Sequence, residues 1–118
     1  MVVHHRDRLT DSEIDRVFHA LADTTRRDIV ARVMGGEPAS VSALAARYAM
    51  SFAAVQKHVA VLEEAGLVTK EPQGRERIVR ANPDRIARAR TLLAELEELW
   101  KGRFSRIDAL FTDTPTRE

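Results

Sequence analysis

The sequence contains no cysteine, which excludes disulfide bonds, thiolate metal ligands and cysteine nucleophiles. It also lacks any apolar run near the roughly 18 residues that a membrane-spanning helix requires. Residues 1–7 do not form the apolar stretch of a signal peptide. From these absences we expect a cytoplasmic protein that has no membrane partner.

The sequence also has no large excess of positive or negative charge. The 118 residues include 19 Lys and Arg against 18 Asp and Glu, which gives a net charge of +1. A DNA-binding protein needs a local basic surface rather than a basic total, so the positions of the basic residues must decide. We find no nucleophile–base set, no carboxylate pair and no glycine-rich phosphate loop. The sequence therefore predicts no enzyme, no catalytic residue and no cofactor.

The order of helix and strand signals predicts one globular domain over 11–111, with a flexible arm at 1–10 and a tail at 112–118. Helical spacing, capping residues and turn residues predict four helices, a hairpin and one long helix. The first helix is capped by Asp11 or Ser12, and the second follows Asp23–Thr25 and stops at Gly35–Gly36. The third is capped by Ser40 or Ser42 and covers Ala43 to about Tyr48, and the fourth runs from Phe52 to Ala65. The strands are Val68–Glu71 and Glu76–Ala81, and the long helix covers 83–111. The fold class is mainly α with a small β-hairpin (α+β).

The last helix carries one apolar stripe, whose spacing alternates between three and four up to Trp100 and resumes at Ile107; such a heptad-like stripe is typical of helices that pair. Its members are Ile86, Ala89, Leu93, Leu96, Trp100, Ile107 and Phe111. A helix of about 28 residues is longer than a domain of this size can cover by itself. We therefore expect a homodimer in which Leu93, Leu96, Trp100 and Ile107 form the interface, together with the first helix.

Two short helices over 42–65 and a basic hairpin over 68–81 form a helix-turn-helix with a wing. The second helix has the dimensions to enter a major groove, which is about 12 Å wide. With Val55, Val59 and Leu62 turned inward, its opposite face carries Ala53, Gln56, Lys57 and Ala60. The basic residues of the hairpin are Lys70, Arg75, Arg77 and Arg80.

This face suits double-stranded DNA. Gln56 can pair with adenine through two hydrogen bonds, Lys57 can reach guanine or phosphate, and Ala53 permits close approach. The helix N-terminus at Ser51 offers free N–H groups to a phosphate, and the wing arginines suit the DNA backbone. A solvated helix face and an ordinary basic hairpin would show the same periodicity, so the pattern by itself leaves both interpretations open.

Several stretches resemble the ArsR family of winged-helix repressors in consistent order over residues 13–111. They are FHALADTTRRDI at 18–29, similar to the family's "ALADPTRR", MSFAAVQKHV at 50–59, VLEEAGLV at 61–68, the wing turn at 74–77, and LWKGRF at 99–104, which resembles the tail of a cysteine-free branch. The resemblance implies a five-helix winged fold, a symmetric dimer built from the first and last helices, and operator binding that represses transcription.

Carried over by motif, the resemblance implies DNA contacts from Ser51, Gln56, Lys57 and His58 on the recognition helix and from Arg75 and Arg77 on the wing. Gln56 stands where the family usually has Ser, so the operator sequence cannot be transferred from relatives. Thr24 replaces a common Pro, which changes only how that helix starts. His58 lies at the edge of the inward stripe, where a packed histidine bonded to a backbone carbonyl and a phosphate contact are both open.

Many members of the family sense a metal, but the ligands for this are missing here. Residues 42–47 hold no soft ligand and residues 82–118 hold no histidine. The sequence therefore predicts a metal-independent repressor, whose signal is an unidentified small-molecule effector, a partner protein or its own concentration. Two alternatives stay open: a protein-interaction module on the same scaffold, and a metal-responsive repressor with a non-standard site, for instance at His4, His5 and His19.

Overall fold

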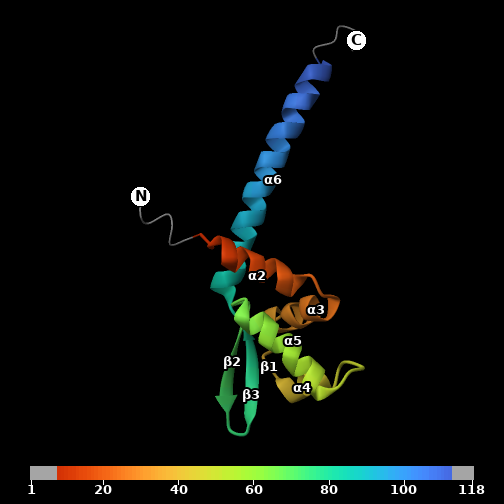
Figure 1. Cartoon of the computed structure of the whole chain (residues 1–118), viewed down its shortest axis with the longest axis vertical. Coiled ribbons are helices and arrows are strands. Elements are labelled where there is room, and N and C mark those ends of the chain that lie inside the picture. Colours follow the sequence, from red (N-terminus) through yellow and green to blue (C-terminus); the bar gives the residue numbers. More distant parts are fainter. Residues whose placement is uncertain (1–7, 113–118) are drawn as a thin grey trace.

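The computed structural model describes the backbone of residues 8–112 and the side chains within that range, except those at 103–109, 111 and 112. Residues 1–7 of the expected arm at 1–10 and residues 113–118 of the expected tail at 112–118 lie outside the described residues. Five helices and a three-stranded antiparallel sheet form the described part, which confirms the mainly α winged helix-turn-helix (Figure 1). They are α2 (Asp11–Leu21), α3 (Thr24–Met34), β1 (Ala39–Ser40), α4 (Val41–Ala45), α5 (Phe52–Glu64), β2 (Val68–Gln73), β3 (Glu76–Ala81) and α6 (Pro83–Thr112).

Most helices begin at the capping residue that the sequence indicates. The side chains of Asp23, Ser40 and Ser51 each accept a hydrogen bond from the backbone N–H three residues later, at the starts of α3, α4 and α5. These bonds satisfy donors that the first helical turn leaves without a partner. The starts of the helix-turn-helix elements are therefore set by local chemistry.

The first helix is the exception, because the expected cap at Asp11 or Ser12 is wrong. Thr10 caps α2: its Oγ1 accepts a hydrogen bond from the Glu13 N–H at 3.2 Å, and the Glu13 carboxylate accepts one from the Thr10 N–H at 2.8 Å. This reciprocal capping box satisfies two donors at once, which neither alternative cap would do. The ordered contacts begin still earlier, since Leu9 packs against the core and Arg8 pairs with Glu95 at 3.2 Å.

The sheet has the order β1-β3-β2, with β3 in the centre. The strand β1 is not among the sequence-based expectations, and β2 continues to Gln73, two residues past its expected end. Directly opposed residues include Lys70 with Val79 and Pro72 with Arg77, so these four side chains share one face of the hairpin. Val79 is buried, and Arg77 therefore lies farther along the face that is packed on the domain.

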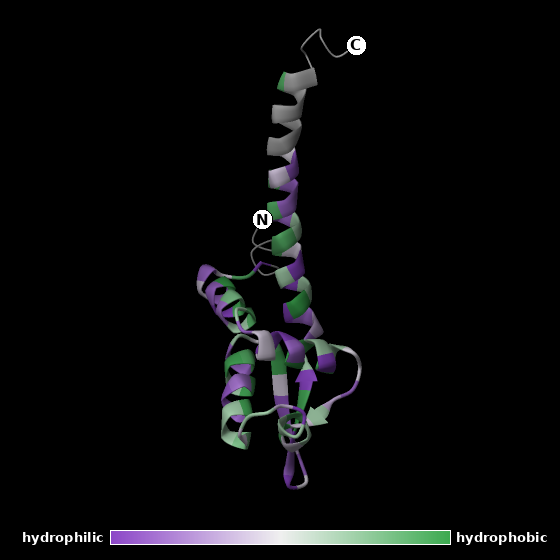
Figure 2. Ribbon diagram, turned by 90° about the vertical axis from the view of Figure 1, so that its right-hand side faces the viewer, coloured by the Kyte–Doolittle hydropathy of each residue, from purple (hydrophilic) through white to green (hydrophobic). Residues whose placement is uncertain are grey.

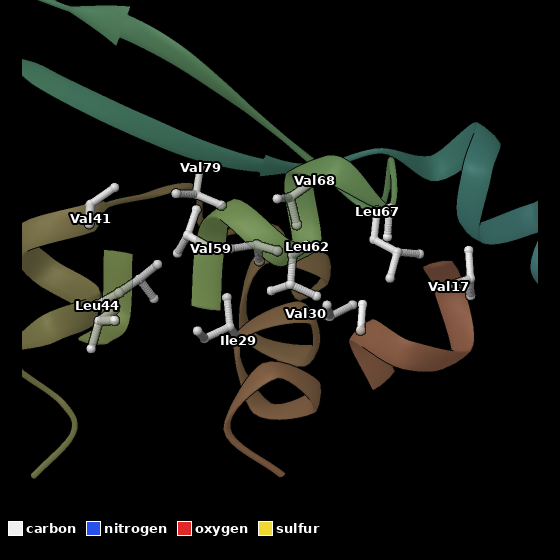
Figure 3. Packing of buried hydrophobic residues seen from close by; sticks show 14 residues of the cluster. Val17, Ile29, Val30, Val41, Leu44, Val59, Leu62, Leu67, Val68 and Val79 are labelled. Carbon is white, nitrogen blue, oxygen red and sulfur yellow. The ribbon is translucent and has the colours of Figure 1, made fainter. Parts of the chain in front are cut away.

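The inward stripe of α5 lies at the centre of the core. Val55, Val59 and Leu62 are completely buried, as expected, and they pack among residues of α2, α3, α4 and the sheet (Figure 3). The other buried members of this cluster are Val17, Ala20, Ile29, Val30, Val33, Val41, Leu44, Ala65, Leu67, Val68 and Val79. The outward face of α5 is fixed as a consequence.

An arginine connects the end of α5 to α6 and α2. The Arg85 guanidinium donates to the Ala65 carbonyl at 3.0 Å and to the Glu13 carboxylate at 3.3 Å. It lies directly against Gly66, which has a φ of 79° and follows the last turn of α5. Glycine is favoured here for two reasons. The left-handed backbone conformation is unfavourable for residues with a side chain, and a Cβ at this position would collide with the Arg85 guanidinium.

The long helix and the wing point away from the body at opposite ends (Figure 1). The helix α6 has 30 residues, and α2 crosses its base, while most of its length stands clear of the other elements. Figure 2 shows hydrophobic segments along α6 and a hydrophilic tip on the hairpin. No helix within the described range is long and apolar enough to cross a membrane.

Replacing Gly66 with Ala should destabilise the domain more than replacing Gly74, a matched glycine at the hairpin turn. Both have a positive φ, 79° and 65°, but a Cβ at Gly66 would lie 2.8 Å from Arg85 Cζ, whereas nothing lies within 4 Å at Gly74. We expect the free energy of unfolding to fall by about 1–2 kcal/mol for Gly74→Ala and by about 2–4 kcal/mol for Gly66→Ala. Urea unfolding measures both, and equal losses would contradict the role given to Arg85.

Candidate nucleic-acid interface

The outward face of α5 carries the residues that the sequence places there. Ser51, Ala53, Gln56 and Lys57 are all exposed. Ser51 lies at the N-terminus of α5, where its hydroxyl accepts a hydrogen bond from the Ala54 N–H at 3.1 Å. The last turn of the same helix instead exposes two carboxylates, Glu63 and Glu64. The N-terminal half of this face is therefore the part compatible with a polyanion.

A hollow of about 330 Å³ joins this half of α5 to the wing. It is lined by Val41 and Ser42 of α4, Phe52 and Gln56 of α5, and Lys70, Arg75, Glu76 and Arg77 of the hairpin or its turn. Gln56 is thus brought together with both wing arginines that the sequence singles out. We call this hollow the helix–wing groove.

The basic residues of the hairpin divide into two kinds. Lys70 pairs with Glu63 at 3.5 Å, and Arg80 pairs with Glu71 at 3.0 Å. Among the residues that the structure describes, Arg75 and Arg77 have neither an ion pair nor a side-chain hydrogen bond, and the same holds for Lys57 on α5. These three charges are available to an anion from outside the protein.

His58 lies away from this face. Its ring is half-buried, with 22% of the side chain exposed, and Nδ1 accepts a hydrogen bond from Arg26 Nη1 at 3.2 Å. The Asp23 carboxylate is 3.9 Å from the same nitrogen. Its neighbours are therefore side chains at the start of α3, whereas sequence reasoning considered a backbone carbonyl or a phosphate.

Arg26 is a positioning residue that sequence reasoning did not single out. Its Nε donates to the Ala20 carbonyl at 2.7 Å and its Nη2 donates to the His19 carbonyl at 3.1 Å, while Nη1 reaches His58. One guanidinium thus joins the last turn of α2 to the middle of α5. The signal in the sequence that could have identified Arg26 is its position in the FHALADTTRRDI stretch at 18–29, which resembles the ArsR family.

The electrostatics of this junction depend on Asp23. The hydrogen bond from the Arg26 backbone N–H lowers the pKa of Asp23 below its ordinary value of 3.8, and electrostatic interaction with the His58 and Arg26 side chains lowers it further. The pKa of Glu13 is lowered chiefly by the Thr10 backbone N–H, and that of Asp28 by the Tyr48 hydroxyl. The fold therefore stabilises the ionised form of Glu13, Asp23 and Asp28 relative to the unfolded chain.

A second exposed surface, apolar this time, lies on α6. Leu93, Leu96 and Trp100, which the sequence assigns to a dimer interface, are exposed, whereas the side chain of Ile107 lies outside the described residues. Sequence reasoning did not include Phe18 of α2 and Leu99 of α6, which are exposed as well. Phe18 and Leu93 line one small hollow between α2 and α6, so the apolar surface continues across both helices.

Comparison with known proteins gives consistent results. Residues 21–71 match a family described as a helix-turn-helix domain. The HTH-type transcriptional regulator Rv2034 of Mycobacterium tuberculosis is 41% identical over 86 residues, which are 73% of this chain and 77% of that protein. A crystal structure of an ArsR family transcriptional regulator is 34% identical, with a TM-score of 0.72 over 80% of this chain and 96% of the other.

A homodimeric winged helix-turn-helix DNA-binding domain from Mycobacterium bovis shares the fold, with 21% identity and a TM-score of 0.60 over 76% of this chain and 89% of that one. The fold and these relatives define the class: a transcriptional regulator with a helix-turn-helix DNA-binding domain rather than an enzyme. Within that class, the chain belongs to the ArsR family.

The lowered pKa of Asp23 predicts a particular dependence of stability on acid. Because its pKa is lower in the folded than in the unfolded chain, its contribution is present above the unfolded pKa and is lost as the pH falls through the folded pKa. Asp23→Asn keeps an acceptor for the cap but does not titrate. We therefore expect the melting temperature of Asp23→Asn to fall less steeply than that of the wild type between about pH 5 and about pH 2.

Glu13 and Asp28 titrate in both chains, so the difference between the two melting curves isolates Asp23. Identical acid dependence in the two chains would show that the charge of Asp23 does not stabilise this junction.

Proposed function

We propose that this chain is a metal-independent repressor that binds an inverted-repeat operator as a homodimer. The observation that carries the proposal is the helix–wing groove, in which exposed Gln56 lies beside Arg75 and Arg77. Neither arginine has a partner among the described residues, so the groove combines a base-reading amide with two available cations. We further propose that the protein acts in the cytoplasm.

In this proposal the N-terminal half of α5 enters the major groove. The Gln56 amide pairs with adenine N6 and N7, and the small side chain of Ala53 permits close approach. Lys57 reaches a guanine or a phosphate, and the start of α5 at Ser51 approaches a phosphate with its backbone N–H groups. Glu64, which is exposed at the other end of the helix, keeps that end away from the DNA backbone by charge repulsion. His58 is not required as a contact, because it faces α3.

The wing contributes affinity that does not depend on sequence. Arg77 lies on the hairpin face that is turned toward the domain, and both Arg75 and Arg77 line the helix–wing groove. Cations placed on phosphates release condensed counterions, so their contribution weakens as salt rises. Helix and wing thus have different tasks, one reading bases and the other fixing the register on the duplex.

A homodimer follows from the uncovered apolar surface of α2 and α6. Phe18, Leu93 and Leu96 together expose more apolar side chain than the domain can cover from its own described elements. A second copy related by a two-fold axis would bury the exposed apolar side chains of α2 and α6 and place two α5 helices about 34–36 Å apart. The operator is then an inverted repeat with half-site centres about ten base pairs apart.

Metal independence is proposed from the ligands that the sequence offers. The chain has no cysteine, and its four histidines are at 4, 5, 19 and 58. The described residues include no group of three or more potential ligands close enough to hold a metal. An effector, where one acts, is therefore proposed to be a small organic molecule rather than a metal ion.

The division between helix and wing can be measured with three variants on a preferred operator. Gln56→Ala should cost about 1–3 kcal/mol on that operator and much less on random DNA, because it removes a base contact. Arg75→Ala and Arg77→Ala should weaken all sequences alike and reduce the slope of log affinity against log salt by about one unit for each phosphate that is no longer neutralised. Fluorescence anisotropy at several salt concentrations measures both effects.

Arg80→Ala is the matched control, since Arg80 lies on the same strand but is already paired with Glu71. It should change the salt slope less than Arg77→Ala does. If Gln56→Ala is neutral while Arg75→Ala alters sequence preference, the wing reads bases and the proposed roles are reversed.

The dimer can be tested with an acidic residue placed in the apolar stripe. Leu96 is 49% exposed in the single chain, so Leu96→Asp should leave the fold intact but prevent the stripe from being buried against a second copy. Sedimentation at micromolar concentration should show a dimer for the wild type and a monomer for Leu96→Asp. Ala87→Asp is the control, because Ala87 is also exposed on α6 and lies about two and a half turns before Leu96, on the opposite side of the helix. A wild-type monomer, or equal effects of the two variants, would oppose the proposal.

A further inference from the structure

Phe52 is an exposed apolar residue of the helix–wing groove, and the proposed contacts leave it without a role. It is the first residue of α5 and is 48% exposed, although the remaining lining of this groove is largely polar or cationic. Keeping an aromatic ring in contact with water is unfavourable by about 25 cal/mol for each Å² left exposed. A ligand that offers an apolar group at this position would remove that cost.

The position of Phe52 relative to Gln56 defines which group this is. The two residues are four apart on one helix and line the same groove, so they lie on the same side of α5, separated by about 6 Å along its axis. Successive base pairs are about 3.4 Å apart, so this distance corresponds to about two base pairs. The apolar group that a major groove presents is the C5-methyl of thymine, and phenylalanine is one of the side chains suited to contact it.

We propose that Phe52 is a specificity-determining residue that contacts the C5-methyl group of a thymine within about two base pairs of the adenine paired with Gln56. The inference rests on the proposed function and deepens it by assigning a second base to each half-site. Duplex DNA is favoured over a protein partner as the occupant, because Arg75 and Arg77 line the same groove with no partner among the described residues. A partner that recognises the groove must therefore be anionic around its apolar group.

Replacing thymine by uracil tests this contact directly, since uracil pairs with adenine in the same way and lacks only the methyl group. Each thymine of a preferred operator is replaced in turn, and the affinity of the wild-type dimer is measured by fluorescence anisotropy. One thymine in each half-site should show a loss of about fourfold, the factor expected for one buried methyl group. The other thymines should show little change.

The same operators are then bound by Phe52→Ala, Phe52→Leu and Met34→Ala. In Phe52→Ala the thymine and uracil operators should bind with equal affinity, whereas Phe52→Leu should retain part of the difference because leucine is still apolar. Met34 is the matched control, because it is 52% exposed on α3 and does not line the groove. Met34→Ala should show the full fourfold loss. If Phe52→Ala does not fold, as judged by its melting temperature, Phe52→Leu and the wild-type scan still decide.

The outcomes separate this inference from the function on which it rests. The inference is overturned if the wild type binds its operator but no thymine shows a loss. It is overturned equally if Phe52→Ala, or Phe52→Leu in its place, keeps the whole loss of the wild type. A folded wild-type dimer that binds no DNA at low salt would overturn both the inference and the proposed function, and would leave an anionic protein partner for the groove.

Discussion

The complete burial of Val55, Val59 and Leu62 is the interaction on which the rest of the structure depends. Each such side chain contributes about 1.5–3 kcal/mol relative to its exposed state, so turning α5 about its axis would cost several kcal/mol. Gln56 and Lys57 are therefore held outward by what the opposite face buries. Side chains that read DNA have to be placed to within a fraction of an ångström, and the core supplies that placement without any contact from the outward residues themselves.

Two arginines extend this control to the rest of the chain. Arg26 joins the last turn of α2 to His58, and Arg85 joins the end of α5 to both α6 and Glu13 of α2. Both guanidiniums donate hydrogen bonds to backbone carbonyls at the C-terminal ends of helices. Because α2 and α6 carry the apolar surface proposed for the dimer, these two side chains would help to orient the α5 helices of the two copies. In the proposed dimer, the distance between half-sites would therefore depend in part on these contacts within each protomer.

Sequence reasoning predicted what depends on neighbouring residues and missed what depends on distant ones. The caps Asp23 and Ser51 and the bounds of α5 and β3 follow from local signals, and the outward position of Gln56 follows from the helical period. Thr10 was missed although Glu13 three residues later completes the capping-box pattern. The strand β1 has only two residues and forms because β3 pairs with it, so no local pattern announces it. The contact of His58 with Arg26, 32 residues away, and the exposure of Phe52 in the groove likewise depend on tertiary packing.

Selection of bound DNA from a random pool tests most directly whether this chain recognises a specific DNA sequence as a dimer. The wild-type protein is incubated with random duplexes at two salt concentrations, and the bound fraction is sequenced after several rounds. We expect enrichment of an inverted repeat whose half-site centres lie about ten base pairs apart, with weaker retention at the higher salt concentration. A folded protein that enriches no sequence at either salt concentration, or that enriches a single asymmetric site, would contradict this expectation.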